Sequence, residues 1–222
     1  SGYSDKQAQL VTSVVDAIQS PVWSQGRFDR VRERLIRALN NAKFGTPYSQ
    51  AMSHLVDYLL IPQWSNQAHL DAVETVSLMD VQNFSQQLVT GFDIAVLAHG
   101  NINQDAARRM AADVRGRFAQ PAANALVKRA QVLRLERGES LLSRLHVDHA
   151  DKALVVYMQG RGRSLDERAG IALLTRILSS PFYTELRTNQ QLGYVVFASA
   201  MPLVEVPAVS LVIQSPTHDP AT

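Results

Sequence analysis

An α+β fold, with mixed sheets and helices packed on them, is predicted by two patterns in the 222-residue sequence. In the first half, apolar residues recur at helical spacing in one segment after another. From residue 131 onward, short apolar or alternating segments typical of strands flank a well-capped helix. We therefore expect two α/β units, residues 1–119 and 131–222, joined by a linker at residues 120–130, where Pro, Ala and Asn replace the periodic pattern.

Helices dominate the predicted first unit. The expected helices are 4–20, 28–39, 48–60, 65–74, 80–88 and 103–117, the last capped by Asn103. A compact apolar run at 92–98 predicts one buried strand before the last helix. One strand cannot form a sheet alone. This unit is therefore expected to be the end of a larger domain whose other strands lie upstream.

The predicted second unit alternates strands with one long helix. Strands are expected at 132–135, 141–147, 153–158, 194–199 and 208–214. The capping box Ser164-Leu-Asp-Glu167 opens the long helix, whose apolar stripe continues to Leu178, and a short helix is expected at 182–187. The pattern would next require another helix, so this unit is also expected to be incomplete.

Composition excludes several classes of protein. A formal net charge of +2 is too small to indicate a nucleic-acid partner. No apolar run approaches the roughly 18 residues that span a bilayer, so no membrane association is expected. Because the chain has 0 Cys, it cannot contain a disulfide or a thiolate zinc site.

The residues alone do not complete a catalytic site. Neither His-Glu-x-x-His nor its inverted form His-x-x-Glu-His occurs among the 6 His. The nearest pair, His146 and His149, would point to opposite faces of an extended segment, so we favour ordinary polar residues over a metal site. The turn Gly160-Arg-Gly162 is interpreted as a connection, with an anion site at the helix N-terminus as the alternative.

An arginine-rich face on the expected helix 28–39 also has two interpretations. Five arginines lie on or beside the polar side of that helix: Arg27, Arg30, Arg32, Arg34 and Arg37. A phosphate-binding face is one interpretation. The solvated side of an amphipathic helix is the one we favour, because no aromatic residues interleave with the charges and the net charge is near zero.

One segment resembles a known family. Residues 180–197, Ser-Pro-Phe-Tyr-Thr-Glu-Leu-Arg-Thr-Asn-Gln-Gln-Leu-Gly-Tyr-Val-Val-Phe, are similar to the C-terminal half of the insulysin–pitrilysin metallopeptidases, the insulinase family of inverted zincins. The core Leu-Arg-Thr-x-x-Gln-Leu-Gly-Tyr at 186–194 is a specific signature. His99-Gly-Asn-Ile102, the segment 149–159 and Ile213-Gln-Ser215 resemble further family segments in the same order.

This resemblance implies an architecture. Family members pair two homologous halves around a closed chamber, and each half holds two α+β domains. Residues 1–119 would be the C-terminal part of the third domain, and 131–222 the N-terminal part of the fourth. The family's zinc, bound by His-x-x-Glu-His and a downstream Glu in the first domain, would be held by residues outside this chain, with no metal ligand here.

The resemblance also assigns candidate site residues. Arg187 and Tyr194 match the family's substrate-side pair, and Gly193 would shape the turn between them. Arg187 offers several rigid donors to peptide carbonyls. The Tyr194 hydroxyl would donate to a substrate carbonyl or a developing oxyanion. The competing interpretation is structural: an Arg that binds helix carbonyls and a half-buried strand Tyr.

The expected function follows from the family. The chain would be part of a zinc-dependent endopeptidase for peptides or small unfolded proteins, inactive by itself. Its partners would be the N-terminal catalytic half of the same protein and peptide substrates, and the isolated fragment would tend to self-associate. The alternative is a non-catalytic insulinase-like subunit for binding or assembly. The residues do not determine the compartment; a periplasmic or cytoplasmic location is expected, with the periplasm slightly favoured by analogy with pitrilysin-type relatives.

Overall fold

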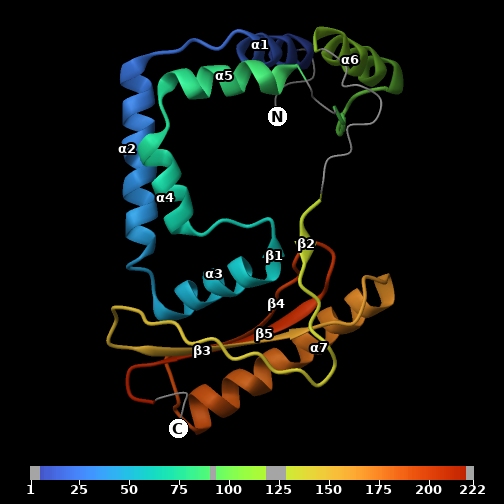
Figure 1. The fold of residues 1–222 in the computed structure, drawn as a ribbon. Helices are drawn as coiled ribbons and strands as arrows, with labels where there is room; N and C mark the ends of the chain where they lie inside the picture. Colours follow the sequence, from blue (N-terminus) through green and yellow to red (C-terminus); the bar gives the residue numbers. More distant parts are fainter. Residues whose placement is uncertain (1–5, 91–93, 119–128, 219–222) are drawn as a thin grey trace. The chain divides into compact units, whose positions relative to one another are not determined.

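The computed structural model describes residues 6–90, 94–118 and 129–218 (Figure 1). Its contacts divide the chain into two compact units. Unit 1 comprises Ser1–Leu35 and Ala72–Lys128, and unit 2 comprises Ile36–Asp71 and Arg129–Thr222. Each unit is therefore assembled from two stretches of sequence. In the described part of the chain, no helix is both long enough and apolar enough to cross a membrane.

The regular secondary structure of unit 1 is helical in its described residues. It contains α1 (Gln7–Gln19), α5 (Leu78–Val89) and α6 (Gln104–Arg117), with parts of α2 (Gln25–Ala42) and α4 (Asn66–Thr75). Asn103 caps α6 as predicted, because its Oδ1 accepts a hydrogen bond from the Ala106 amide at 2.8 Å. Helices α1 and α6 are in contact, and Arg117 Nη1 pairs with Asp16 Oδ1 at 2.6 Å.

Unit 2 is built on a three-stranded antiparallel sheet of order β3-β5-β4. Its elements are α3 (Pro47–Leu59), β1 (Leu60–Ile61), β2 (Gln131–Val132), β3 (Lys152–Gln159), α7 (Leu165–Tyr183), η1 (Thr184–Asn189), β4 (Val195–Ala200) and β5 (Ala208–Ser215). Helix α3 packs against β3 and β5, while α7 packs against β4 and β5. Figure 1 shows the two helices on opposite faces of the sheet.

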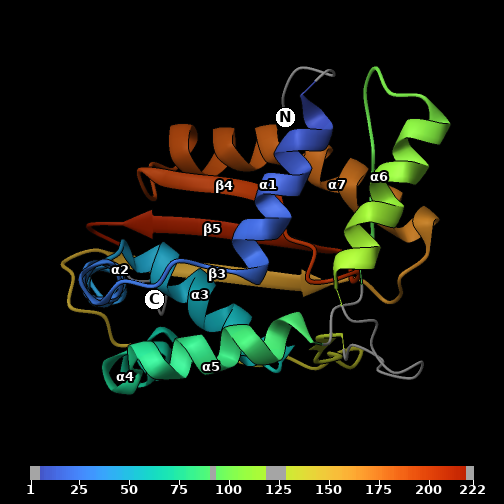
Figure 2. The same cartoon turned by 90° about the horizontal axis from the view of Figure 1, so that it is seen from above.

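Strand β5 is the buried centre of this sheet. Figure 2 shows it lying between β3 and β4. Val209, Val212 and Gln214 on β5 are exposed by 2%, 0% and 0%. In the register, Gln214 lies opposite Ala153 on one side and Val195 on the other. An antiparallel ladder with helices on both faces therefore buries a polar side chain, Gln214, which must find hydrogen-bond partners inside the unit.

Two of the predicted strands are wrong. Ile94–Ala98 has no regular structure and is largely exposed, with Leu97 at 92%; residues 92 and 93 lie outside the described residues. Residues 141–147 are also irregular, and Leu142 is 78% exposed. Apolar sequence alone does not make a strand, because the backbone needs a partner for its ladder of hydrogen bonds.

The predicted strand at 132–135 forms only in part. Strand β2 ends at Val132 and pairs with β1 alone. Beyond it, the Gln159 side chain takes the place of a neighbouring strand. Its Oε1 accepts from the Leu135 amide at 3.0 Å, and its Nε2 donates to the Leu133 carbonyl at 2.9 Å. The backbone groups are satisfied without continuing the ladder.

The predicted short helix at 182–187 is also not a separate element. Helix α7 continues through Pro181 to Tyr183 and passes directly into the π-helical turn η1. Ser164 caps α7 as predicted, with its Oγ 3.2 Å from the Glu167 amide. The predicted linker at 120–130 lies mostly outside the described residues, so the boundary between family domains stays a prediction.

Candidate functional site

The turn that carries the signature lies between α7 and β4. The π-helix η1 ends at Asn189, and Gln191 then adopts a positive φ of 52°. The Leu192 amide donates back to the Leu186 carbonyl at 2.9 Å, which closes the turn. A π-helix is uncommon and frequently marks a functional site. The turn delivers Gly193 and Tyr194 directly to the start of β4.

Gly193 is required by the sheet itself. A Cβ at this position would lie 2.3 Å from the Gln214 carbonyl oxygen and 3.0 Å from its carbon. The backbone at 193 lies this close to Gln214 because the amide of the next residue, Tyr194, donates a hydrogen bond to that same carbonyl at 3.2 Å. Any side chain at 193 would push β4 away from β5. The predicted turn-positioning role of Gly193 thus has a physical basis in this close backbone approach.

Tyr194 belongs to a hydrogen-bonded cluster of three side chains. Its hydroxyl donates to Asp151 Oδ2 at 2.6 Å, and Gln214 Nε2 donates to the hydroxyl oxygen at 2.5 Å. Gln214 Nε2 also donates to Asp151 Oδ2 at 2.9 Å. The residues come from the segment before β3, the segment before β4 and the end of β5. We call Asp151, Tyr194 and Gln214 the tyrosine cluster.

The electrostatics of the tyrosine cluster keep the proton on the phenol. The hydrogen bond from Tyr194, with a second from Gln214, lowers the pKa of Asp151 below its usual range. The hydrogen bond to Asp151 raises the pKa of Tyr194, and burial adds to this effect. Both directions favour a carboxylate beside a neutral phenol across the neutral pH range.

Arg187 lies on η1, away from the tyrosine cluster. Its guanidinium stands over the Tyr183 ring, with 5.6 Å from Cζ to the ring centroid. Among the described residues it makes no ion pair and no hydrogen bond with Tyr194. Its acidic neighbour Glu185 is bound instead by Gln190 and Asn189, at 2.8 Å each, and these bonds lower the pKa of Glu185. The donors of Arg187 are therefore not engaged by that carboxylate.

An open groove runs beside Tyr183. It is formed between α7 and β4 and has a volume of about 500 Å³. Its lining combines a cation, hydroxyl groups, an aromatic ring and strand residues: Arg176, Ser179, Ser180, Tyr183, Val196, Phe197 and Ala198. In the described sheet, β4 pairs with β5 alone, so its other edge faces away from the ladder. Because Tyr183 also contacts Arg187, the groove and the Arg187 guanidinium adjoin.

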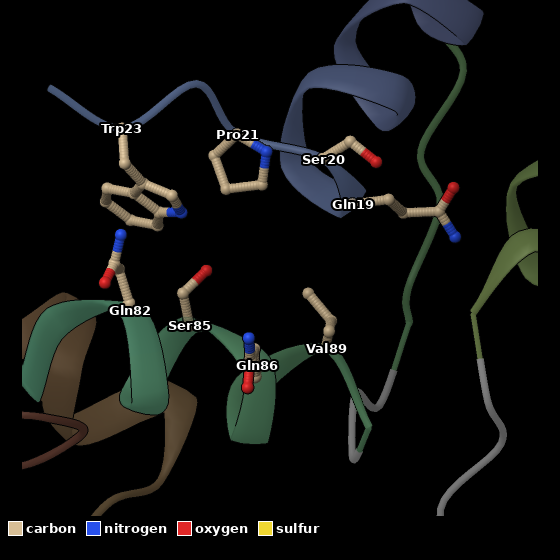
Figure 3. A pocket seen from close by; sticks show the side chains of 8 residues that line it. All are labelled: Gln19, Ser20, Pro21, Trp23, Gln82, Ser85, Gln86 and Val89. Atoms are coloured by element: carbon tan, nitrogen blue, oxygen red, sulfur yellow. The ribbon is translucent and has the colours of Figure 1, made fainter. Parts of the chain in front are cut away.

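A second pocket lies in unit 1 and has different chemistry. Figure 3 shows its lining, in which the Trp23 indole faces Gln82 and the side chains of Ser85 and Val89 point into the space, with Gln86 on the helix between them. Its volume is about 230 Å³. None of the side chains that line it is titratable. The pocket therefore supplies no acid, base or metal ligand.

The other candidates from the sequence do not assemble into sites. In the described ranges, no group of three or more His, Cys, Asp or Glu is placed to hold a metal ion. His149 uses its Nδ1 to accept from the Asp151 amide at 2.9 Å. In the Gly160–Gly162 turn, a carboxylate oxygen of Glu167 accepts from the Arg161 amide, so the position open to an anion is already filled by the chain's own acid.

Sequence reasoning missed Asp151 and Gln214 as partners of Tyr194. Both lie in segments that resemble the family, 149–159 and 213–215. Spacing gave no signal, because Asp151 is 43 residues from Tyr194 and Gln214 is 20 residues away. A polar Gln inside an apolar strand was the usable clue, because such a side chain has to be hydrogen-bonded when it is buried.

Known proteins match this chain along almost its full length. A family model described as the middle or third domain of peptidase M16 matches residues 1–72, and one described as PQQ synthase PqqF-like, C-terminal lobe domain 4, matches residues 173–222. The insulin-degrading enzyme of Homo sapiens is 28% identical over 98% of this chain and 22% of its own length. That of Drosophila melanogaster is 27% identical over 98% and 23%. Protease 3 of Salmonella typhi is 25% identical over 99% and 23%.

Solved structures show the same fold. The crystal structure of pitrilysin matches with a TM-score of 0.77 and 20% identity, over 99% of this chain and 23% of that one. A chain of complex III2 from Candida albicans with Inz-5 bound matches with a TM-score of 0.58 and 11% identity, over 94% and 51%. The chain spans less than a quarter of the length of the curated relatives named above. The two domain models and these relatives together fit the insulinase family of metallopeptidases.

Proposed function

We propose that this chain is part of a zinc-dependent endopeptidase that cleaves peptides or small unfolded proteins, and that it supplies substrate-binding residues. Its relatives include proteins named insulin-degrading enzyme and putative zinc protease. The residues of this chain do not fit a zinc site, because the sequence lacks both histidine motifs and Cys, and the described residues form no metal-binding group. Zinc would be bound by residues elsewhere in the full-length protein.

The observation that supports this proposal most directly is the arrangement around the η1 turn. Arg187 carries donors that no carboxylate neutralises among the described residues, beside a groove lined by hydroxyl groups. Tyr194 follows the turn with 49% of its surface exposed. In the proposed mechanism, Arg187 binds carbonyl groups of the peptide, and Tyr194 donates its hydroxyl hydrogen to the carbonyl oxygen as negative charge develops there.

The proposed partners are the catalytic half of the same protein and the peptide substrate. Apolar side chains on α7 support a protein partner, because large ones remain exposed: Leu165 at 77%, Leu173 at 63% and Ile177 at 62%. Such side chains gathered on one helix are typical of an interaction surface. By itself, the chain would associate through this face and would not cleave peptides.

The test is steady-state kinetics on the full-length protein that carries this chain. Removing one transition-state donor typically costs about 10²–10³-fold in kcat, so Tyr194→Phe should lower kcat by that order. Arg187→Ala should raise KM, because it removes donors that already bind the ground state. Metal analysis should find zinc in the full-length protein and none held stoichiometrically by the 222-residue chain.

A non-catalytic subunit is the alternative, and one observation favours it. The Tyr194 hydroxyl hydrogen is engaged by Asp151, as in a structural tie between strands. A full-length protein without zinc and without chelator-sensitive cleavage of peptides would support this alternative. Wild-type kcat in Tyr194→Phe, with zinc and cleavage present, would instead remove only the role assigned to Tyr194.

A further inference from the structure

Gln214 is the fixed member of the tyrosine cluster. Its side chain is fully buried, and its Oε1 accepts a hydrogen bond from the Tyr48 backbone amide at 3.2 Å. That contact decides which way the amide faces, because a reversed amide would place two donors together at Tyr48. The Nε2 group must then face Asp151 and Tyr194. Helix α3 thus sets the orientation of a side chain on β5, which in turn holds the phenol oxygen.

Asp151 is the exchangeable member. A phenol hydroxyl has one hydrogen, and here it is donated to Asp151 Oδ2. Rotation about the Cζ–O bond moves this hydrogen without moving the ring or the oxygen. Gln214 continues to donate to the oxygen during that rotation, and it also continues to donate to Asp151. The hydroxyl oxygen therefore keeps its place when a new acceptor takes the hydrogen.

We propose that Asp151 and Gln214 are positioning residues, which hold the Tyr194 hydroxyl in place until a substrate carbonyl replaces Asp151 as the acceptor of its hydrogen. This inference rests on the proposed function for its kinetic consequence. What Asp151 provides is an acceptor oxygen directly before the start of β3. A side chain of the same shape that has an acceptor oxygen should substitute for Asp151. A side chain without an acceptor oxygen should leave the Tyr194 hydroxyl bound to Gln214 alone.

Four variants of the full-length protein and one control variant test this inference. Asp151→Ala should lower kcat by roughly 10- to 100-fold, the order expected when a reacting group is misplaced, with KM little changed. Asp151→Asn keeps an acceptor oxygen and should stay within about threefold of the wild-type kcat, since the geometry is preserved. Tyr194→Phe and the double variant Asp151→Ala/Tyr194→Phe should have equal kcat values, because Asp151 acts through the hydroxyl. Asp148→Ala, an exposed acid three residues away, is the matched control.

A second readout does not depend on turnover. The phenol of Tyr194 is titrated by its ultraviolet absorbance, as the difference between each protein and its Tyr194→Phe counterpart. Asp151→Ala should lower the pKa of this phenol, because the hydrogen bond to Asp151 is the main cause of its raised value. Asp148→Ala should leave the titration unchanged.

The outcomes separate this inference from the proposed function. If Tyr194→Phe lowers kcat but Asp151→Ala does not, the positioning role is wrong and the function of Tyr194 stands. The positioning role is also wrong if Asp151→Ala lowers kcat by the same factor in the wild-type protein and in the Tyr194→Phe protein. It is likewise wrong if the kcat of Asp151→Asn is as low as that of Asp151→Ala. Wild-type kcat in Tyr194→Phe overturns the positioning role together with the role of Tyr194, and leaves the proposed endopeptidase function standing if zinc and cleavage are present. Melting temperatures measured alongside identify a variant that is slow only because it is less folded.

Discussion

Substituting Gly193 by alanine tests the geometry on which the whole site depends. The added Cβ would lie 2.3 Å from the Gln214 carbonyl oxygen. A saturated carbon and a carbonyl oxygen touch at about 3.3 Å, so β4 and β5 would have to separate by about 1 Å at this point. The bond from the Tyr194 amide to that carbonyl, 3.2 Å long, would be broken by such a shift.

The expected cost follows from three contributions. Overpacking in a well-packed region costs about 1–3 kcal/mol. Loss of one backbone hydrogen bond adds about 1 kcal/mol. The lower entropy of unfolded alanine returns about 0.4–1 kcal/mol. The net destabilisation is about 1–3.6 kcal/mol, which for a unit of this size lowers the melting temperature by about 2–14 °C.

The assay is thermal unfolding followed by circular dichroism, with kcat measured on the full-length protein. Gly170→Ala is the matched control, because its Cβ would meet nothing within 4 Å on the exposed side of α7. That change should stabilise the helix by about 0.5–1 kcal/mol. Gly193→Ala should also lower kcat, because it displaces both Tyr194 and Gln214. A Gly193→Ala protein that melts and turns over like the wild type would refute the close approach of the two strands.

Two further outcomes are expected. Ser164→Ala removes the hydroxyl that accepts from the Glu167 amide, and should destabilise α7 by about 1 kcal/mol in thermal unfolding, whereas Ser164→Asp, which keeps a capping oxygen, should not. The stability difference between wild type and Tyr194→Phe should be constant from about pH 5 to 9. Below that range the stability difference should shrink, because the pKa of Asp151 is lowered in the folded protein and the contribution of Asp151 is lost as pH falls through that folded-state pKa. Above that range the difference should also shrink, because the pKa of Tyr194 is raised in the folded protein and the contribution of Tyr194 is lost as pH rises through that folded-state pKa. A difference that rises steadily with pH across the neutral range would contradict this assignment.

Helices were largely predictable because their signals are local. Apolar spacing and the caps at Asn103 and Ser164 act within a few residues, and the structure has these helices within a few residues of the expected positions. The wrong strands at 92–98 and 141–147 have strand-like composition but no partner among the described residues. The η1 turn was also not predicted. Its hydrogen bonds join residues five apart and not four apart as in an α-helix, and so short a turn produces no recognisable spacing of apolar residues.

The candidate site was predictable only as far as the signature extends. The motif at 186–194 contains Arg187, Gly193 and Tyr194, and the resemblance assigned their roles as a hypothesis. The reason for Gly193, a backbone approach to β5, needed the strand register. The partners of Tyr194 needed the sheet topology, because β5 lies between β3 and β4 although it comes after both in the chain.

The direction of one hydrogen bond decides how the structural and catalytic interpretations of Tyr194 are distinguished. A hydroxyl that only ties strands together loses its value when either partner is removed, so stability and activity would fall in step. A hydroxyl that is held for a substrate has a second acceptor to meet, and activity then falls further than stability does. In the tyrosine cluster, Gln214 holds the oxygen and Asp151 holds the hydrogen. The hydrogen alone has to move, so the arrangement is compatible with donation to a substrate carbonyl even though the hydroxyl is engaged in this structure.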